Sequence, residues 1–302
     1  MLGIERLCGL ILQVKSKYTL ATDCEITVEV NPGTVDFYDL KRLKEAGVNR
    51  LSIGIQAAND GVLKAIGRIH SFEQAKNCIL DARKAGFDNL SGDIIFALPN
   101  QSLEEFCRGV NDIIAIGLDH ISAYSLQIEE GTAIYKRQNE LQLPDEDGEE
   151  AQYTALCGIL AENGYEHYEI SNFARRGKNS RHNGNYWDCG EYFGFGAAAH
   201  SYYNGKRFSG VCDVKEFIER SFISALAPTD YDNAEYISAE EAEEERIMLG
   251  LRTSKGARIP EGKHSVARRI ADLGYGCFND DVLTLNSKGF RVSNEIIGEI
   301  LV

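Results

Sequence analysis

The chain has 302 residues and a formal net charge of -14, and 43% of its residues are hydrophobic. That length exceeds the size at which one hydrophobic core usually stops growing, so we expect a large domain with smaller parts. The acidic balance argues against a nucleic acid partner, because phosphate backbones are bound by clustered lysine and arginine. There is no apolar run of about eighteen residues, and charged Glu5 and Arg6 interrupt the amino terminus. We therefore expect a cytoplasmic protein with no membrane-spanning segment.

Helices and strands are predicted to alternate through the first half of the chain. Apolar residues at helical spacing indicate a helix over 2–16, and an apolar strand follows at 25–30. Ser102 and Glu105 have the capping-box spacing, so a helix is predicted to begin there. The other predicted elements are helices at 36–45, 71–85 and 148–163, and strands at 50–56, 89–98 and 120–128.

Alternation of this kind indicates parallel strands joined by helical crossovers, and so an α/β sheet or barrel over 1–165. The connecting segment 166–235 is aromatic and glycine-rich. A strongly acidic helix is predicted from Glu240, followed by helix, hairpin and helix over 265–302. We therefore predict a small winged-helix-like domain at 236–302. It lacks a basic face, so DNA binding is not expected.

Polar residues lie where the predicted parallel strands end. Glu29, Gln56 and Asp93 are within or at the end of three strands, and Arg68 follows the second. The carboxyl ends of parallel strands meet at one edge, where ligands bind, so these side chains could line one pocket. A structural role stays open, because such a carboxylate can also cap a helix or pair with an arginine.

Five segments, in chain order, resemble successive motifs of the oxygen-independent coproporphyrinogen III oxidase family of radical S-adenosylmethionine (SAM) proteins. The resemblance implies a partial radical SAM (βα) barrel that begins late in the family pattern. Ala97 stands where the family usually has glycine. The segments are Glu29-Val-Asn-Pro32, Leu51-Ser-Ile-Gly-Ile-Gln56, Gly67-Arg-Ile-His70, Asp93-Ile-Ile-Phe-Ala-Leu-Pro-Asn-Gln101 and Tyr124-Ser-Leu-Gln-Ile-Glu-Glu-Gly-Thr132.

The same resemblance implies which residues would hold SAM. Glu29, Gln56, Arg68 and Asp93 match family positions that contact the cofactor, and Gln127 matches a further contact. Carboxylate and amide groups would hold the polar atoms of SAM, and the arginine would add fixed donors.

A later segment resembles the heme chaperone branch of the family. Ser180-Arg-His-Asn-Gly-Asn-Tyr-Trp187 contains a His-Asn-x-x-Tyr-Trp signature that is not expected in the oxidases. A histidine can ligate heme iron, and aromatic rings offer flat apolar surface to a porphyrin. His182 in this aromatic loop could equally be a hydrogen-bonded structural residue. The heme candidates are His182, Asn183, Tyr186, Trp187 and, as a second ligand candidate, His200.

The cysteine loop that defines radical SAM proteins is not found. The eight cysteines are scattered, with Cys8 and Cys24 the closest pair, and a cluster held by one loop needs thiolates a few residues apart. The family's Cys-x-x-x-Cys-x-x-Cys and Gly-Gly-Gly-Thr-Pro segments are absent, so this chain is not expected to bind a [4Fe-4S] cluster in the family manner. The chain is expected to be a truncated piece or a naturally shortened protein, with strand 25–30 left as an unpaired edge.

Three functions are consistent with these observations. The first, favoured by the motif that ends at Trp187, is a heme chaperone that binds heme and passes it to an acceptor protein, with SAM and cluster binding expected of the full-length form. The second is the oxidase itself, which decarboxylates coproporphyrinogen III in porphyrin synthesis. The third is an inactive fragment. Whether this chain is an enzyme stays open, since SAM cleavage needs an electron source.

Overall fold

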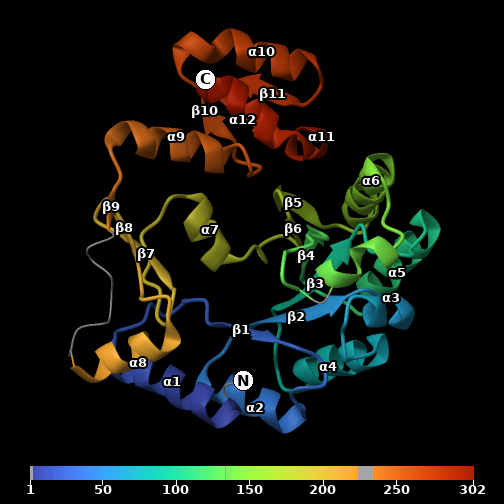
Figure 1. The fold of residues 1–302 in the computed structure, drawn as a ribbon, viewed down its shortest axis with the longest axis vertical. Coiled ribbons are helices and arrows are strands. Elements are labelled where there is room, and N and C mark those ends of the chain that lie inside the picture. The colour runs from blue at the N-terminus through green and yellow to red at the C-terminus, as the bar shows by residue number, and fades with distance from the viewer. Residues whose placement is uncertain (1–2, 133, 224–233) are drawn as a thin grey trace. The chain divides into compact units, whose positions relative to one another are not determined.

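The computed structural model describes residues 3–132, 134–223 and 234–302, and Figure 1 shows its elements. The chain divides into two compact units, Met1–Asn179 and Ser180–Val302. The first unit contains a large buried apolar cluster between sheet and helices, and the second has buried residues of its own, among them Ile270 and Leu283. The three-part division at 165 and 235 stays a prediction.

The first unit contains a six-stranded sheet with the order β1-β2-β3-β4-β6-β5. The first four of these strands run parallel, which confirms the predicted crossovers, and β5 and β6 form an antiparallel hairpin that the sequence analysis did not predict. Among the described strands β1 pairs with β2 alone. The bounds are β1 Thr27–Val30, β2 Arg50–Gln56, β3 Leu90–Phe96, β4 His120–Ser125, β5 Glu166–Glu169 and β6 Asn172–Ala174.

Helices α2 to α6 of this unit begin at residues whose side chains cap them. Ser102 accepts a hydrogen bond from the Glu105 N–H at 3.2 Å and donates its own N–H to the Glu105 carboxylate at 3.0 Å, so the predicted capping box is confirmed. Short α3 was not predicted. The elements are α1 Ile4–Lys17, α2 Phe37–Ala46, α3 Asp60–Ala65, α4 Phe72–Lys84, α5 Leu103–Ala115, η1 Tyr135–Glu140 and α6 Glu146–Glu162.

The parallel sheet has one apolar and one polar face. In β2, Leu51, Ile53 and Ile55 belong to the apolar cluster that also includes residues of α2, α4 and α5. Because strand side chains alternate, the residues between them lie on the other face. We call this the polar face; it comprises Glu29 of β1, Arg50 and Ser52 of β2, Ser91 and Asp93 of β3, and His120 and Ser122 of β4.

The second unit combines two small antiparallel sheets with helices. The acidic helix is confirmed as α9, and helix, hairpin and helix are confirmed as α10, β11–β12 and α12. A further short helix, α11, follows the hairpin, and the Asn286 side chain caps it by accepting the N–H groups of Lys288 and Gly289. The sheets are β7-β8-β9 and β10-β12-β11. The elements are α7 Arg181–Trp187, β7 His200–Tyr203, β8 Lys206–Ser209, α8 Val214–Ile223, β9 Glu235–Tyr236, α9 Ala239–Gly250, β10 Ala257–Arg258, η3 Glu261–Lys263, α10 His264–Asp272, β11 Gly276–Asn279, β12 Val282–Leu285, α11 Ser287–Arg291 and α12 Ser293–Leu301.

His120 is a fully buried histidine on the polar face. Its Nδ1 is 2.8 Å from the Ser91 hydroxyl and its Nε2 is 2.8 Å from the Tyr168 hydroxyl. Burial, together with a smaller effect of the charge of Arg50, lowers the pKa of His120 to about 3. The imidazole is therefore neutral at physiological pH and links two hydroxyl groups.

This burial predicts acid sensitivity. Because the folded pKa of His120 is below its unfolded value, its contribution to stability is complete above about pH 6.5 and is lost as pH falls toward about 3. Urea unfolding should show that the wild type loses up to about 1.4 kcal/mol per pH unit more than His120→Gln between about pH 6.5 and pH 5. Equal pH dependence of the two proteins would contradict this assignment.

Candidate functional site

A half-buried carboxyl group, that of Asp93, lies in the middle of the polar face. The Ser52 hydroxyl donates to both Asp93 oxygens, at 3.0 and 3.2 Å, and Asp93 lies in register with Ser122 of β4. Burial raises the pKa of Asp93, and the nearby charge of Glu29 adds to the rise. Hydrogen bonds from Ser122 and Ser52 act in the opposite direction. The carboxyl is therefore partly desolvated and fixed in position, as expected of a group that binds a ligand.

Gln56 ends β2 in a left-handed backbone conformation, with a φ of 69°. The register with β3 shifts between Gly54 and Gln56, and the Gln56 side chain is buried. A Cβ atom on Gly54 would lie 2.8 Å from Gln56 Nε2 and 3.4 Å from Asn31 Oδ1. The glycine thus leaves the space that the Gln56 amide occupies. A strained residue beside a space that only glycine leaves open is typical of a binding site.

Helix α6 supports the carboxyl ends of β3 and β4. The Ala97 N–H donates to Gln152 Oε1 at 2.8 Å, and the Ser125 hydroxyl donates to Glu149 Oε1 at 2.7 Å. Ala97 has a φ of 57°, a conformation that glycine adopts with less strain, which explains why the related family usually has glycine there.

The structure brings together some of the predicted SAM residues. Exposed Glu29 lies in register with Ser52, so it shares the polar face with Asp93, and Gln56 ends the strand between them. Arg68 is half-buried after α3, and Gln127 is exposed beyond β4. Within the described ranges, no hydrogen bond or ion pair joins these last two side chains to the others, so their role stays a prediction.

Tyr124 is a polar-face residue for which no role was predicted from the sequence. It follows Ser122 by two residues on β4, so strand alternation places it on the polar face. Burial raises the pKa of the Tyr124 hydroxyl, and the charge of Asp93 adds to this rise. The sequence signal that could have identified Tyr124 was its position two residues after Ser122, which puts both side chains on the same face of the strand.

Removing the serine donor should change the carboxyl group measurably. Ser52→Ala deletes a hydrogen bond that lowers the pKa of Asp93, so that pKa should rise further. Carbon-13 NMR titration of the aspartate carboxyls measures it, with exposed Ser16→Ala as the control. An unchanged Asp93 titration in Ser52→Ala would show that the hydrogen bond has no influence.

The histidine–aromatic motif of the second unit was expected to be a loop. It forms helix α7, so that expectation was wrong. Ser180 caps α7 by accepting the Asn183 N–H at 3.2 Å. The rings of His182 and Tyr186, four residues apart, meet edge to face with centroids 5.0 Å apart. Asn183 and Trp187 form the next pair at this spacing and are half-buried. The motif spacing is therefore helical, and it places His182 and Tyr186 side by side on an exposed turn.

Further aromatic rings extend from this helix. Tyr186 packs edge to face on Tyr192 at 4.6 Å between centroids, and Phe193 and Tyr203 are 5.0 Å apart. Tyr186 is 39% exposed and Phe193 56% exposed, so part of this aromatic surface is open to solvent. The other ligand candidate, His200, is exposed at the start of β7.

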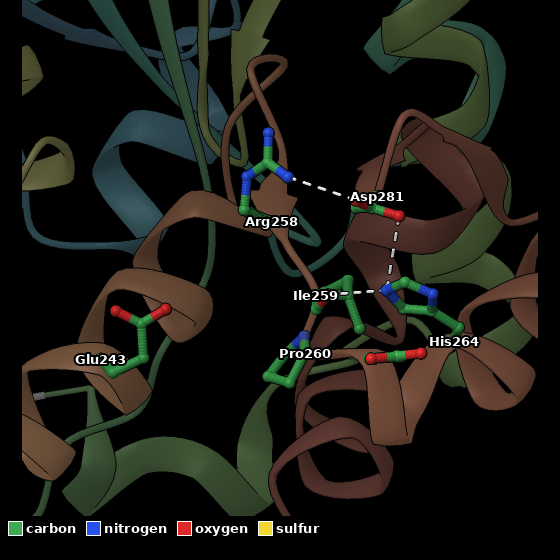
Figure 2. Close-up of a pocket in the computed structure, with 7 residues that line it drawn as sticks. Glu243, Arg258, Ile259, Pro260, His264 and Asp281 are labelled. Carbon is green, nitrogen blue, oxygen red and sulfur yellow. Dashed lines mark hydrogen bonds and ion pairs between the residues drawn. The ribbon is translucent and has the colours of Figure 1, made fainter.

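A separate cavity of about 650 Å³ lies in the second unit (Figure 2). His264 Nε2 donates to the Ile259 carbonyl at 2.9 Å, and Arg258 pairs with Asp281 at 3.3 Å. None of the site residues predicted from the sequence lines it. Its charges are mixed and partly paired, so its walls favour no single class of ligand. The lining residues are Glu243, Arg258, Ile259, Pro260, Glu261, His264 and Asp281.

The cysteines do not fit a cluster held by one loop. All eight are free thiols, and burial raises the pKa of Cys78 and Cys157 to about 11. Within residues 3–132, 134–223 and 234–302, no group of three or more His, Cys, Asp or Glu side chains is placed to hold a metal ion. The helices in these ranges include none with the length and apolar character needed to cross a membrane.

Comparison with known proteins gives consistent results. The model of the radical SAM superfamily matches residues 3–113. The heme chaperone HemW of Lactococcus lactis is 34% identical, with 100% of this chain and 82% of the relative aligned. HemW of Bacillus subtilis is 36% identical over 92% of this chain and 76% of the relative.

A solved structure supports the fold class. The chain superposes on coproporphyrinogen III oxidase (HemN) from Escherichia coli with a TM-score of 0.82, over 99% of this chain and 74% of that chain. Sequence identity is 17%, so this likeness shows the fold alone. It confirms the predicted α/β fold of the radical SAM type.

Proposed function

The chain belongs to the HemW family of heme chaperones and carries a radical SAM match, and from this membership we propose that it binds heme and passes it to an acceptor protein. The curated relatives favour this function over the oxidase. The observation that carries the proposal is the contact between His182 and Tyr186 on exposed α7.

The heme proposal rests on the chemistry and the support of α7. A histidine nitrogen ligates heme iron, and a tyrosine ring four residues away gives the porphyrin a flat apolar surface. Asp188 follows the helix and accepts two hydrogen bonds from Lys255 at 2.7 Å, which anchors the end of α7. Asn183 and Trp187 would complete the binding surface, with His200 as the second ligand candidate.

Substitution of the ligand tests this function. His182→Ala should abolish the Soret shift seen when heme is added to the wild type, because the axial nitrogen is removed. Far-UV circular dichroism should be unchanged, since alanine is a strong helix former. His200→Ala tests the second ligand candidate, and it should keep the shift if His182 is the ligand. A normal shift in His182→Ala together with a lost shift in His200→Ala would transfer the ligand to His200.

We propose that the polar face of the first unit holds SAM at its carboxyl end. The donor set fits, because Glu29 and Asp93 would accept hydrogen bonds from hydroxyl and amino groups, and Gln56 can both donate and accept. Arg68 and Gln127 would add contacts. When bound beside a [4Fe-4S] cluster, SAM supplies radical chemistry. The scattered cysteines do not fit such a cluster, so we assign this chain no radical step.

Substitution of Gly54 gives a test of SAM binding that does not depend on heme binding. Gly54→Ala places a Cβ 2.8 Å from Gln56 Nε2, so the amide must move. Calorimetric titration with SAM should show at least tenfold weaker binding, about 1.4 kcal/mol. Gly158→Ala in α6 is the matched control, because no atom lies within 4 Å of its added Cβ. Equal affinity of both variants and the wild type would remove Gln56 from the SAM site.

A further inference from the structure

Ala97 has a backbone conformation that alanine rarely adopts. It directly follows β3 and has a φ of 57°, which lies in the left-handed region. A Cβ atom is strained in this region, whereas glycine adopts it freely. Asn100 has the same φ, but asparagine tolerates it because its short polar side chain can form local hydrogen bonds. In the loop 97–101, Ala97 is therefore the residue that needs support from outside the loop.

The side chain of Gln152, on α6, supplies this support. Its Oε1 accepts the Ala97 N–H at 2.8 Å, and its Nε2 donates to the Gln101 carbonyl at 3.5 Å. A single amide therefore contacts both ends of the loop. Gln152 is 2% exposed, and a buried amide is costly unless such partners satisfy it. Loss of this amide would leave a strained loop without its buried anchor.

Leu98, inside this loop, connects it to a small apolar cluster. The Leu98 side chain is fully buried. We call this group of residues the Leu98 cluster, and it is distinct from the large core of the first unit. Because packed side chains transmit displacements, a shift of the loop would displace the neighbours of Leu98 as well. The cluster consists of Ala57, Val62, Leu63 and Leu98, with Ile66, Ile95 and Leu126 packed against it.

Three of the proposed SAM residues are joined to the Leu98 cluster by the chain. Gln56 directly precedes one of its members, and Gln127 directly follows a residue that packs against it. Arg68 follows α3, which contributes two members. The position of the loop therefore affects three backbone segments that carry proposed SAM contacts.

We propose that Gln152 is a positioning residue of the SAM site and acts through the loop that it holds. By fixing Ala97 and Leu98, it keeps the Leu98 cluster in the arrangement from which the three attached residues bind the cofactor. The role requires no contact between Gln152 and SAM. It rests on the proposed SAM binding by the first unit and is independent of heme.

Removal of the Gln152 amide tests this role. Gln152→Met deletes both hydrogen bonds and keeps a flexible side chain of similar length. Calorimetric titration should show about tenfold weaker SAM binding than in the wild type, as expected for coupled neighbouring groups. Gln13→Met, at an exposed glutamine of α1, is the matched control and should retain the wild-type affinity.

A second substitution separates the support of Ala97 from the packing of α6. Because glycine adopts a φ of 57° without strain, Ala97→Gly added to Gln152→Met should restore the SAM affinity to within about threefold of the wild type. Lost packing around α6 would not be repaired in this way. Ala198→Gly, at a left-handed alanine of the second unit with a φ of 59°, is the matched control and should restore nothing.

The wild type alone also tests the proposal, in case Gln152→Met fails to fold. Coupling between two sites is reciprocal, so SAM binding should stabilise the loop in turn. Nuclear magnetic resonance should show that saturating SAM slows hydrogen exchange of the Ala97 amide about tenfold. Unchanged exchange of that amide in the SAM complex would overturn the proposal.

The results distinguish a failed positioning role from a failed SAM site. Absence of SAM binding by the wild type would overturn both. Equal SAM binding by the wild type and by Gln152→Met would overturn the positioning role alone. Weak binding by Gln152→Met that Ala97→Gly does not restore, or that Ala198→Gly restores equally, would assign Gln152 a packing role and contradict the proposal.

Discussion

Four parallel strands carry carboxyl, hydroxyl and imidazole groups on one face. The stability of the first unit depends on the hydrogen bonds that satisfy these partly buried polar groups. Serine hydroxyls do most of this: Ser52 donates to Asp93, and Ser91 contacts neutral His120. An apolar cluster on the opposite face holds the strands in the register that these contacts require. A polar interior of this kind contributes less to stability than apolar packing would, and it offers a surface for ligands.

In the second unit the candidate binding surface lies on a helix and not on a sheet. Its candidate heme surface is built on a helix of 7 residues that is held by the Ser180 cap and by the ion pair of Asp188 with Lys255. Aromatic contacts continue from Tyr186 to Tyr192. Because the histidine is exposed on a short helix that is fixed at both ends, it could bind a planar heme without any change in the hydrophobic core. The cargo surface would also remain reachable by an acceptor, as transfer requires.

Much of the first unit could be predicted because its signals are local. The apolar run of β2 and the capping box at Ser102 are visible in the sequence, and strand alternation explains why Glu29 and Asp93 share a face. The left-handed backbone of Gln56 and the contacts of His120 with Ser91 and Tyr168 depend on neighbouring strands, which no local pattern reveals. Helix α7 was missed because it is short and contains glycine and asparagine, which favour other conformations.

Electron–nuclear double resonance of the ferric heme complex tests most directly whether His182 of α7 ligates the heme iron. The chain should be labelled with nitrogen-15 histidine and compared with an unlabelled sample. We predict a heme signal whose hyperfine structure changes with the label, as expected for an axial imidazole. A thiolate-type spectrum that is insensitive to the label would contradict the account and move the ligand to a cysteine, of which Cys189, just beyond α7, is the nearest in sequence.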